Sequence, residues 1–192
     1  MYFASIDAVA GYLDENPGLT HLSVDCSHEL KSLPRLPDTL THLQVQFCGG
    51  MKVLPELPTT LTHLRISVCA QLMRLHSLPS SLQSLTVAHC VRLAALPELP
   101  DQLKCLLLID CPLLPNLPQL PAALRYLKLA DNPGLTCLPP LPSGMEALFL
   151  YNLAGLTSLP QLPRTLKQLD VLSCQGLVSG YLEDYLALSE QS

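Results

Sequence analysis

Cysteine is the residue type in this chain with the widest chemical range, and the chain has eight cysteines. Cys48, Cys69, Cys90 and Cys111 follow one another at intervals of 21 residues, and Cys174 falls on the same count. Such cysteines could bind zinc, but a structural zinc site needs paired short spacings such as Cys-x-x-Cys, which are absent. Disulfides are the other alternative, although parallel side chains in register have poor disulfide geometry. The spacing therefore favours a structural repeat over a reactive site.

Histidine repeats at the same interval. His21, His42 and His63 are 21 residues apart, so three imidazoles would lie one strand spacing from each other and could hold a metal or respond to pH. No carboxylate lies in this row, and ligands in a straight line do not converge tetrahedrally. We therefore expect no metal and no cofactor, and we interpret the histidines as part of a polar strand surface.

No catalytic residue is predicted. The sequence offers no Ser/His/Asp set, phosphate loop or carboxylate pair at a recognisable site. Cys105, which we expect to be exposed, has nothing beside it that marks a nucleophile. An enzyme is thus a disfavoured alternative.

The elements that must position these residues follow from a 21-residue repeat, which is the first feature to seek in any sequence. Eight units begin at Leu19 without insertion or deletion, and we number the positions of each unit from 1 at that residue. Position 4 is always leucine and position 6 is always aliphatic. Positions 3 to 7 alternate with period two, which predicts a short strand with one buried face.

The second half of each unit contains most of the 18 prolines, in motifs such as LPRLP at 33–37 and LPELP at 54–58. Prolines two or three residues apart exclude an α-helix and favour extended or polyproline conformation. Each coil is therefore predicted to be one strand followed by an extended return stroke.

The ends of the chain differ from the repeats. Apolar residues at helical spacing, such as Ile6 and Val9, predict an N-terminal helical cap in residues 1–18. The eight repeats occupy residues 19–178, and a second short helical cap is expected in residues 179–192. Caps are needed because a stack of coils would otherwise expose its core at both ends.

The unit LxxLxVxxCxxLxxLPxLPxx resembles a leucine-rich repeat, and its proline-bearing half is similar to the bacterial class found in type III secreted effectors of the YopM and IpaH families. The resemblance implies a leucine-rich-repeat solenoid of eight 21-residue β/polyproline coils, with a parallel concave β-sheet and short helical caps. It also implies that position 9 turns inward at the strand end and bonds loop backbone. This structural ladder comprises Cys48, Cys69, Cys90, Cys111, Asn132 and Cys174.

The sequence departs from the IpaH type because no cysteine is followed two residues later by aspartate, the motif of that family's ubiquitin-ligase nucleophile. We therefore expect no ligase domain in this chain. Two alternatives stay open: the substrate-recognition arm of a larger ubiquitin-ligase effector, and a repeat segment of an immune-receptor-like protein, since plant receptors of the TIR type have similar repeats with cysteine.

Positions 3, 5 and 7 should form the exposed concave face, because they alternate with the buried leucines. The face is polar in the first units and apolar and aromatic in the later ones, and exposed apolar patches mark protein interfaces. The predicted partner-binding residues are Tyr126, Phe149, Tyr151, Leu107, Ile109, Leu172, Lys128, Arg65, His42 and His63.

The predicted function is that of a non-enzymatic, effector-like module that binds a host or partner protein on the concave face. The net charge of −5 argues against a nucleic-acid partner. No stretch approaches the ~20 apolar residues of a membrane span. An effector would be secreted into the reducing cytosol of a host cell, and otherwise we expect a cytoplasmic protein, because no signal peptide is evident. The oligomeric state is left open.

Overall fold

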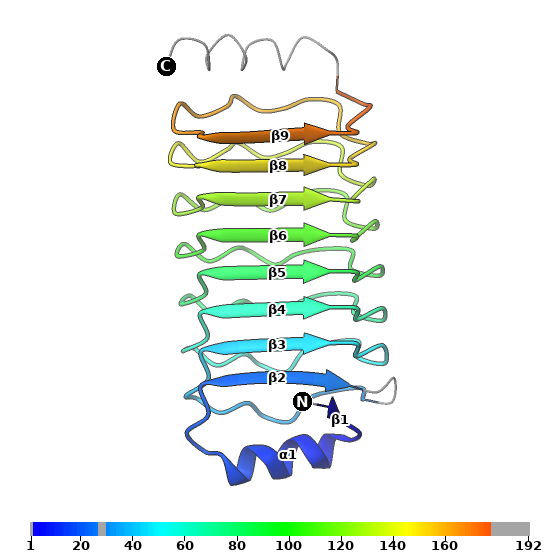
Figure 1. The fold of residues 1–192 in the computed structure, drawn as a ribbon, viewed down its shortest axis with the longest axis vertical. Coiled ribbons are helices and arrows are strands. Elements are labelled where there is room, and N and C mark those ends of the chain that lie inside the picture. Colours follow the sequence, from blue (N-terminus) through cyan, green and yellow to red (C-terminus); the bar gives the residue numbers. More distant parts are fainter. Residues whose placement is uncertain (1, 27–29, 178–192) are drawn as a thin grey trace.

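A computed structural model describes residues 2–26 and 30–177 of the chain. Its strands form one parallel sheet in which the spatial order follows the sequence order from β1 to β9 (Figure 1). The single described helix, α1 (Ile6–Glu15), lies at the β2 end of this sheet. The strands are β1 (Tyr2–Phe3), β2 (His21–Cys26), β3 (His42–Gln46), β4 (His63–Ser67), β5 (Ser84–Ala88), β6 (Cys105–Ile109), β7 (Tyr126–Ala130), β8 (Ala147–Tyr151) and β9 (Gln168–Leu172).

Strands β2 to β9 are the eight predicted strands, and their register repeats the sequence period. Leu22 pairs with Leu43, Leu43 with Leu64, and each following strand adds the residue 21 positions later. Each position of the unit therefore forms a row that runs along the solenoid. The first strand, β1, was not predicted: Tyr2 and Phe3 pair with the end of β2, but two residues outside the repeat carry no periodic signal.

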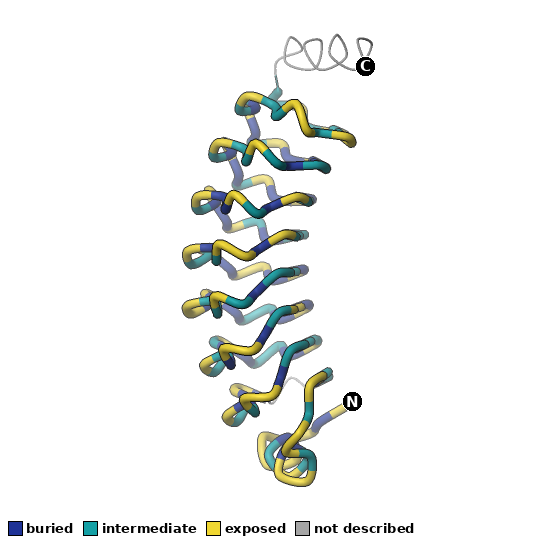
Figure 2. The backbone as a smooth tube through the Cα atoms, turned by 90° about the vertical axis from the view of Figure 1, so that its left-hand side faces the viewer, coloured by how far each residue is buried: buried dark blue, intermediate teal, exposed yellow. Residues whose placement is uncertain are grey.

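The core is aliphatic and continuous from coil to coil. At position 1, Leu40, Leu61 and Leu82 have no exposed surface, and the leucines at position 4 and aliphatics at position 6 lie against them. In the last described coil, Leu169 and Val171 are only partly buried. Figure 2 shows dark blue buried segments recurring in coil after coil, and the column curves slightly, with the sheet on its inner side.

The return strokes contain no described helix, as the prolines require. The carbonyl of the second proline in each motif accepts a hydrogen bond from the N–H of the residue that begins the next unit. Leu40 N donates to Pro37 O at 3.1 Å and Leu61 N to Pro58 O at 3.0 Å, and the same turn recurs in later coils. This second proline is therefore the first residue of a β-turn that leads into the following strand.

A residue in left-handed conformation follows every strand from β3 to β9, a feature that the residue types at this position do not predict. The seven residues at position 8 have φ between 51° and 58°, and none of them is glycine. This conformation reverses the chain so that position 9 enters the core, while the position 8 N–H still pairs with the next coil, as between Val68 N and Ala88 O at 2.9 Å. The seven are Phe47, Val68, His89, Asp110, Asp131, Asn152 and Ser173.

Helix α1 begins after Ser5, whose side chain accepts a hydrogen bond from Ala8 N at 3.2 Å. Val9 and Leu13 are buried, whereas Ile6, which the sequence pattern placed on the buried stripe, is 40% exposed. The expected C-terminal cap at 179–192 lies outside the described residues.

Candidate functional site on the strand face

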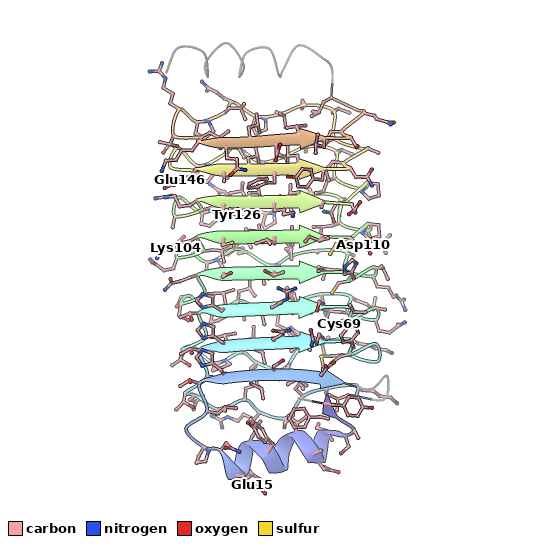
Figure 3. All side chains as sticks on the ribbon, viewed as in Figure 1. Glu15, Cys69, Lys104, Asp110, Tyr126 and Glu146 are labelled. Carbon is pink, nitrogen blue, oxygen red and sulfur yellow. The ribbon has the colours of Figure 1, made fainter. Side chains whose placement is uncertain are left out.

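The side chains at positions 3, 5 and 7 of β2 to β9 project from the side of the sheet that faces the viewer in Figure 3, and we call this surface the strand face. Tyr126 lies on it, whereas Lys104 and Glu146 lie at the edge where the strands begin and Asp110 at the edge where they end (Figure 3). The face has two chemically different halves, because β2 to β5 contribute mainly polar side chains and β6 to β8 contribute mainly apolar ones.

The apolar half is built around three aromatic rings, which we call the aromatic cluster: Tyr126, Phe149 and Tyr151. The ring of Phe149 lies 5.1 Å from that of Tyr126 and 6.3 Å from that of Tyr151, both tilted. Lys128 Nζ lies 5.3 Å from the centre of the Tyr151 ring, which is within cation–π range. The Tyr151 hydroxyl donates to Asp170 Oδ2 at 3.0 Å, so a carboxylate orients this ring.

Burial within the cluster differs from the sequence-based expectation. Phe149 is only 9% exposed, so its ring forms the floor of the cluster and is not the protruding anchor that was expected. The alternation of a strand predicts which way a side chain points, but the neighbouring rings of Tyr126 and Tyr151 decide how much of it they cover. Leu107 and Ile109 are half-buried, whereas Leu172 is 58% exposed.

The phenols and the thiol of this half are neutral groups at physiological pH. Burial, and secondarily Cys105, raises the pKa of Tyr126, while burial and the Asp170 contact raise the pKa of Tyr151. Burial also raises the pKa of the Cys105 thiol, which is the opposite of what a nucleophilic cysteine needs. The chemistry available here is therefore apolar contact and hydrogen bonding.

In the polar half, the rings of His21, His42 and His63 form what we call the imidazole stack. The centre of the His42 ring lies 4.1 Å from that of His21 and 4.2 Å from that of His63, with interplanar angles of 12° and 6°. His21 and His63 are exposed and His42 is half-buried. The strand register brings these three together as the sequence spacing implied.

A threonine before each histidine orients the stack. Thr41 Oγ1 and Thr62 Oγ1 each donate to the carbonyl of the threonine in the preceding coil at 3.0 Å, and each lies 2.9 Å from Nδ1 of the next histidine. A hydroxyl has one proton, so Nδ1 of His42 and of His63 must be the donor. The neutral rings therefore have Nδ1 protonated and a free lone pair on Nε2.

The middle ring resists protonation. Burial, followed by the positive charges that His63 and His21 would add, lowers the pKa of His42. Arg65 on β4 is the permanent cation of this half; its side chain is exposed and has no ion pair or hydrogen bond with any described residue.

The position 9 row lies inside the coil. The residues predicted for the structural ladder are fully buried, except that Cys174 is partly buried: Cys48, Cys69, Cys90, Cys111, Asn132 and Cys174. Asn132 is the best bonded, because its Oδ1 accepts from Cys111 N at 2.9 Å and its Nδ2 donates to Leu108 O and Ala130 O at 3.0 and 2.8 Å.

The cysteines of this row bond more weakly, with Cys69 Sγ donating to Ser67 O at 3.5 Å. Burial raises the pKa of Cys111 to about 11, so this thiol stays protonated. One correction concerns Cys48, which is disulfide-bonded, whereas Cys69 and Cys90 are free. Poor disulfide geometry applies to cysteines at equal positions of neighbouring coils, such as Cys48 and Cys69, and does not extend to other pairs.

Among residues 2–26 and 30–177, no group of three or more histidine, cysteine, aspartate or glutamate side chains is arranged to hold a metal ion. In the same part of the chain, no helix has the length and apolar character that crossing a membrane requires.

No protein-family model matches the chain, and no curated protein matches it in sequence. Among solved structures, the leucine-rich repeat protein TpLRR from T. pallidum matches with a TM-score of 0.58 and 20% identity, over 82% of this chain and 81% of that one. YopM, a leucine-rich effector protein from Yersinia pestis, matches with a TM-score of 0.44 and 24% identity over 83% of this chain, which spans 64% of YopM. A leucine-rich repeat protein from Bacteroides ovatus matches with a TM-score of 0.42 and 19% identity over 81% of this chain, which spans 59% of that protein.

The likeness to TpLRR is a likeness of fold. Together with eight coils 21 residues apart and a continuous parallel sheet, it confirms the predicted fold class, a leucine-rich-repeat solenoid.

Proposed function

We propose that this chain is a non-enzymatic protein-binding module whose partner docks on the strand face. The observation that carries the proposal is the aromatic cluster of Tyr126, Phe149 and Tyr151, which lies on the sheet surface while the core of the same coils is aliphatic. Aromatic side chains with one polar group are enriched at interface hot spots. Leu172 extends the apolar surface beside them.

The surroundings of the cluster support specific recognition. Lys128 lies over the Tyr151 ring, and Asp170 accepts a hydrogen bond from the Tyr151 hydroxyl. One cation and one anion therefore border the apolar rings. An apolar centre with a polar rim is the usual anatomy of a protein interface. The raised pKa of the Cys105 thiol on the same face supports a binding role over a catalytic one.

The binding role is tested by replacing the two more accessible rings and keeping the floor. A variant with Tyr126→Ala and Tyr151→Ala, immobilised as bait, should retain less than a tenth of the partner that the unchanged chain captures, because hot-spot rings contribute about 2 kcal/mol or more each. The matched control is Met73→Ala with Leu113→Ala, which removes two exposed apolar side chains outside the strand face. Equal capture by the two double variants, with unchanged circular dichroism, would contradict the proposal.

At a finer level, we infer an effector-like role in the cytosol of a host cell. Its support is the LPxLP return stroke, which resembles that of secreted bacterial effectors. The test is export of the tagged chain by cells with a working type III secretion system and by cells that lack it. Export that does not depend on that system would contradict the effector role.

A further inference from the structure

The polar half of the strand face contains a groove that the aromatic cluster does not touch. It has a volume of about 480 Å³ and extends over β2 to β5. Its polar side chains are His21, Ser23, His42, Gln44, His63, Arg65, Ser84 and Thr86. None of the described residues that line it has a carboxylate, although the chain as a whole has a net charge of −5. Its permanent charge is therefore the positive charge of Arg65.

We propose that this groove binds an acidic segment of a partner protein, with carboxylates on the Arg65 guanidinium and on the Nε2 atoms of the imidazole stack. The proposal rests on the proposed function in one respect, that the strand face receives a protein. Charge complementarity selects the occupant, because an exposed guanidinium with no partner among the described residues matches a carboxylate bidentately.

The tautomer of the stack makes the binding pH-dependent. Since Nδ1 of His42 and His63 donates to threonine, Nε2 is an acceptor in the neutral ring and repels a carboxylate. Protonation turns each Nε2 into a charged donor. A bound carboxylate also offsets the repulsion that neighbouring imidazolium rings exert on His42, so binding should raise the pKa of His42 and take up a proton.

The charged groups near the imidazole stack favour tighter binding of a carboxylate at lower pH. His42 pairs in register with His21 on β2 and with His63 on β4, both of them bases, and Arg65 lies two residues beyond His63, where it pairs with Gln44. The acid of β2, Asp25, lies at the other end of the strand, where it pairs in register with Gln46 and accepts from its Nε2 at 3.4 Å. The pKa of His42 is lowered first by burial and then by the positive charges that His63 and His21 would add.

The spacing suits an extended peptide. Adding the two centroid distances of 4.1 and 4.2 Å places the outer rings about 8 Å apart. Alternate side chains of an extended strand lie about 7 Å apart on one face. Acidic residues at alternate positions would therefore reach both outer rings of the stack, and Arg65 lies two residues beyond His63 on the same face of β4.

The experiment uses the full chain and a blocked peptide that alternates glutamate and serine, with glutamine in place of glutamate as the control peptide. Isothermal titration at pH 7.5 and pH 6.0 should show affinity rising about tenfold at the lower pH, as linkage to one proton predicts. Titration in two buffers of different ionisation enthalpy should show net proton uptake. Binding of the glutamine peptide with equal affinity would overturn the proposal.

Variants identify the groups responsible. Replacing His21, His42 and His63 together by Gln, which already occupies this position in β9 as Gln168, should remove the proton uptake and the pH dependence. Arg65→Gln should weaken binding about tenfold at both pH values, because it removes a charge-assisted bidentate contact. Lys52→Gln, which removes an exposed cation outside the strand face, should leave peptide binding unchanged.

Two further outcomes would overturn the proposal. One is a pH dependence that survives the triple histidine change. The other is full displacement of the peptide by inorganic phosphate at matched ionic strength, which would indicate a site for a free anion. Partner capture separates the two proposals. If the unchanged chain does not bind the peptide, but Tyr126→Ala with Tyr151→Ala still abolishes partner capture, the acidic groove is rejected and the proposed function stands.

Discussion

At the scale of the residue, the side chain of Asn132 at position 9 makes more hydrogen bonds to the backbone than the cysteines at the same position do. Asn132 is fully buried and makes three hydrogen bonds to backbone atoms of its own coil and of the preceding one. Cys90 at the equivalent place donates one long bond, to Ala88 O at 3.5 Å. A buried backbone group without a hydrogen-bond partner destabilises the folded state. Asparagine and cysteine at position 9 should therefore contribute differently to the free energy of unfolding.

We expect Asn132→Ala to lower the free energy of unfolding by about 2–4 kcal/mol, since it leaves several buried backbone groups without a partner. Urea denaturation followed by circular dichroism measures this. Asn132→Cys, the residue of neighbouring coils, should restore part of the loss. If Cys90→Ala is as destabilising as Asn132→Ala, the hydrogen bonds are not the cause.

A second residue-scale feature is the left-handed position 8. Val68 has φ of 55° there, although its branched side chain disfavours this conformation, whereas Asn152 has φ of 51° and is a residue type that tolerates it. Asn152 Nδ2 also donates to Asp131 Oδ1 at 2.8 Å.

Val68→Asn should therefore raise the free energy of unfolding by about 1 kcal/mol through relief of backbone strain, which a higher thermal midpoint would report. The reverse change, Asn152→Val, should lower it. A lower midpoint for Val68→Asn would mean that the exposed valine contributes more through contact than it costs in strain.

At the scale of the element, the coils differ in how closely their loops approach. A Cβ on Gly155 would lie 2.4 Å from Pro133 O and 3.0 Å from Leu135 O, both backbone atoms of the preceding coil. Its φ is ordinary, so the glycine is needed for closeness and not for backbone freedom. Gly11, in helix α1, would meet nothing within 4 Å.

Gly155→Ala should thus destabilise the protein by about 1–3 kcal/mol, because backbone must move to admit the methyl group. Gly11→Ala should instead stabilise it by up to about 1 kcal/mol, as alanine favours the helix. Thermal unfolding of the two variants checks both signs. Equal effects of the two changes would reject the close-approach explanation.

At the scale of the whole molecule, the exact period makes the coils interchangeable in register. Leu61, Leu82 and Leu103 occupy equivalent places with no exposed surface, and each strand of the described sheet pairs with the strands next to it in the sequence. Stability in such an array is approximately a sum of coil and interface terms.

Deleting residues 82–102, one complete unit, should leave a folded solenoid with an unchanged strand signature and a lower unfolding midpoint, because the rows of the core rejoin in register. Circular dichroism and urea denaturation measure this. Deleting 82–92, about half a unit, should prevent folding of the array. If both deletions unfold the chain, the coils are not interchangeable.

The repeat itself was determined by the sequence alone. Residue types that recur every 21 positions determine where β2 to β9 lie, which residues form the aliphatic core and where the return strokes are extended. Each of the eight units has the same local conformational preference, and the units stack in register. The stacking of His21, His42 and His63 follows from the same register. No long-range information beyond the period was needed.

The tertiary structure decided what depends on contacts between particular coils. It covered Phe149 with its neighbours, and it assigned the tautomer of His42 through a threonine bond to the preceding coil. It also turned Val68 into a left-handed conformation that its residue type disfavours. Burial, proton position and backbone strain at one site are set by the residues that surround it in space, and a period in the sequence specifies only which rows are neighbours.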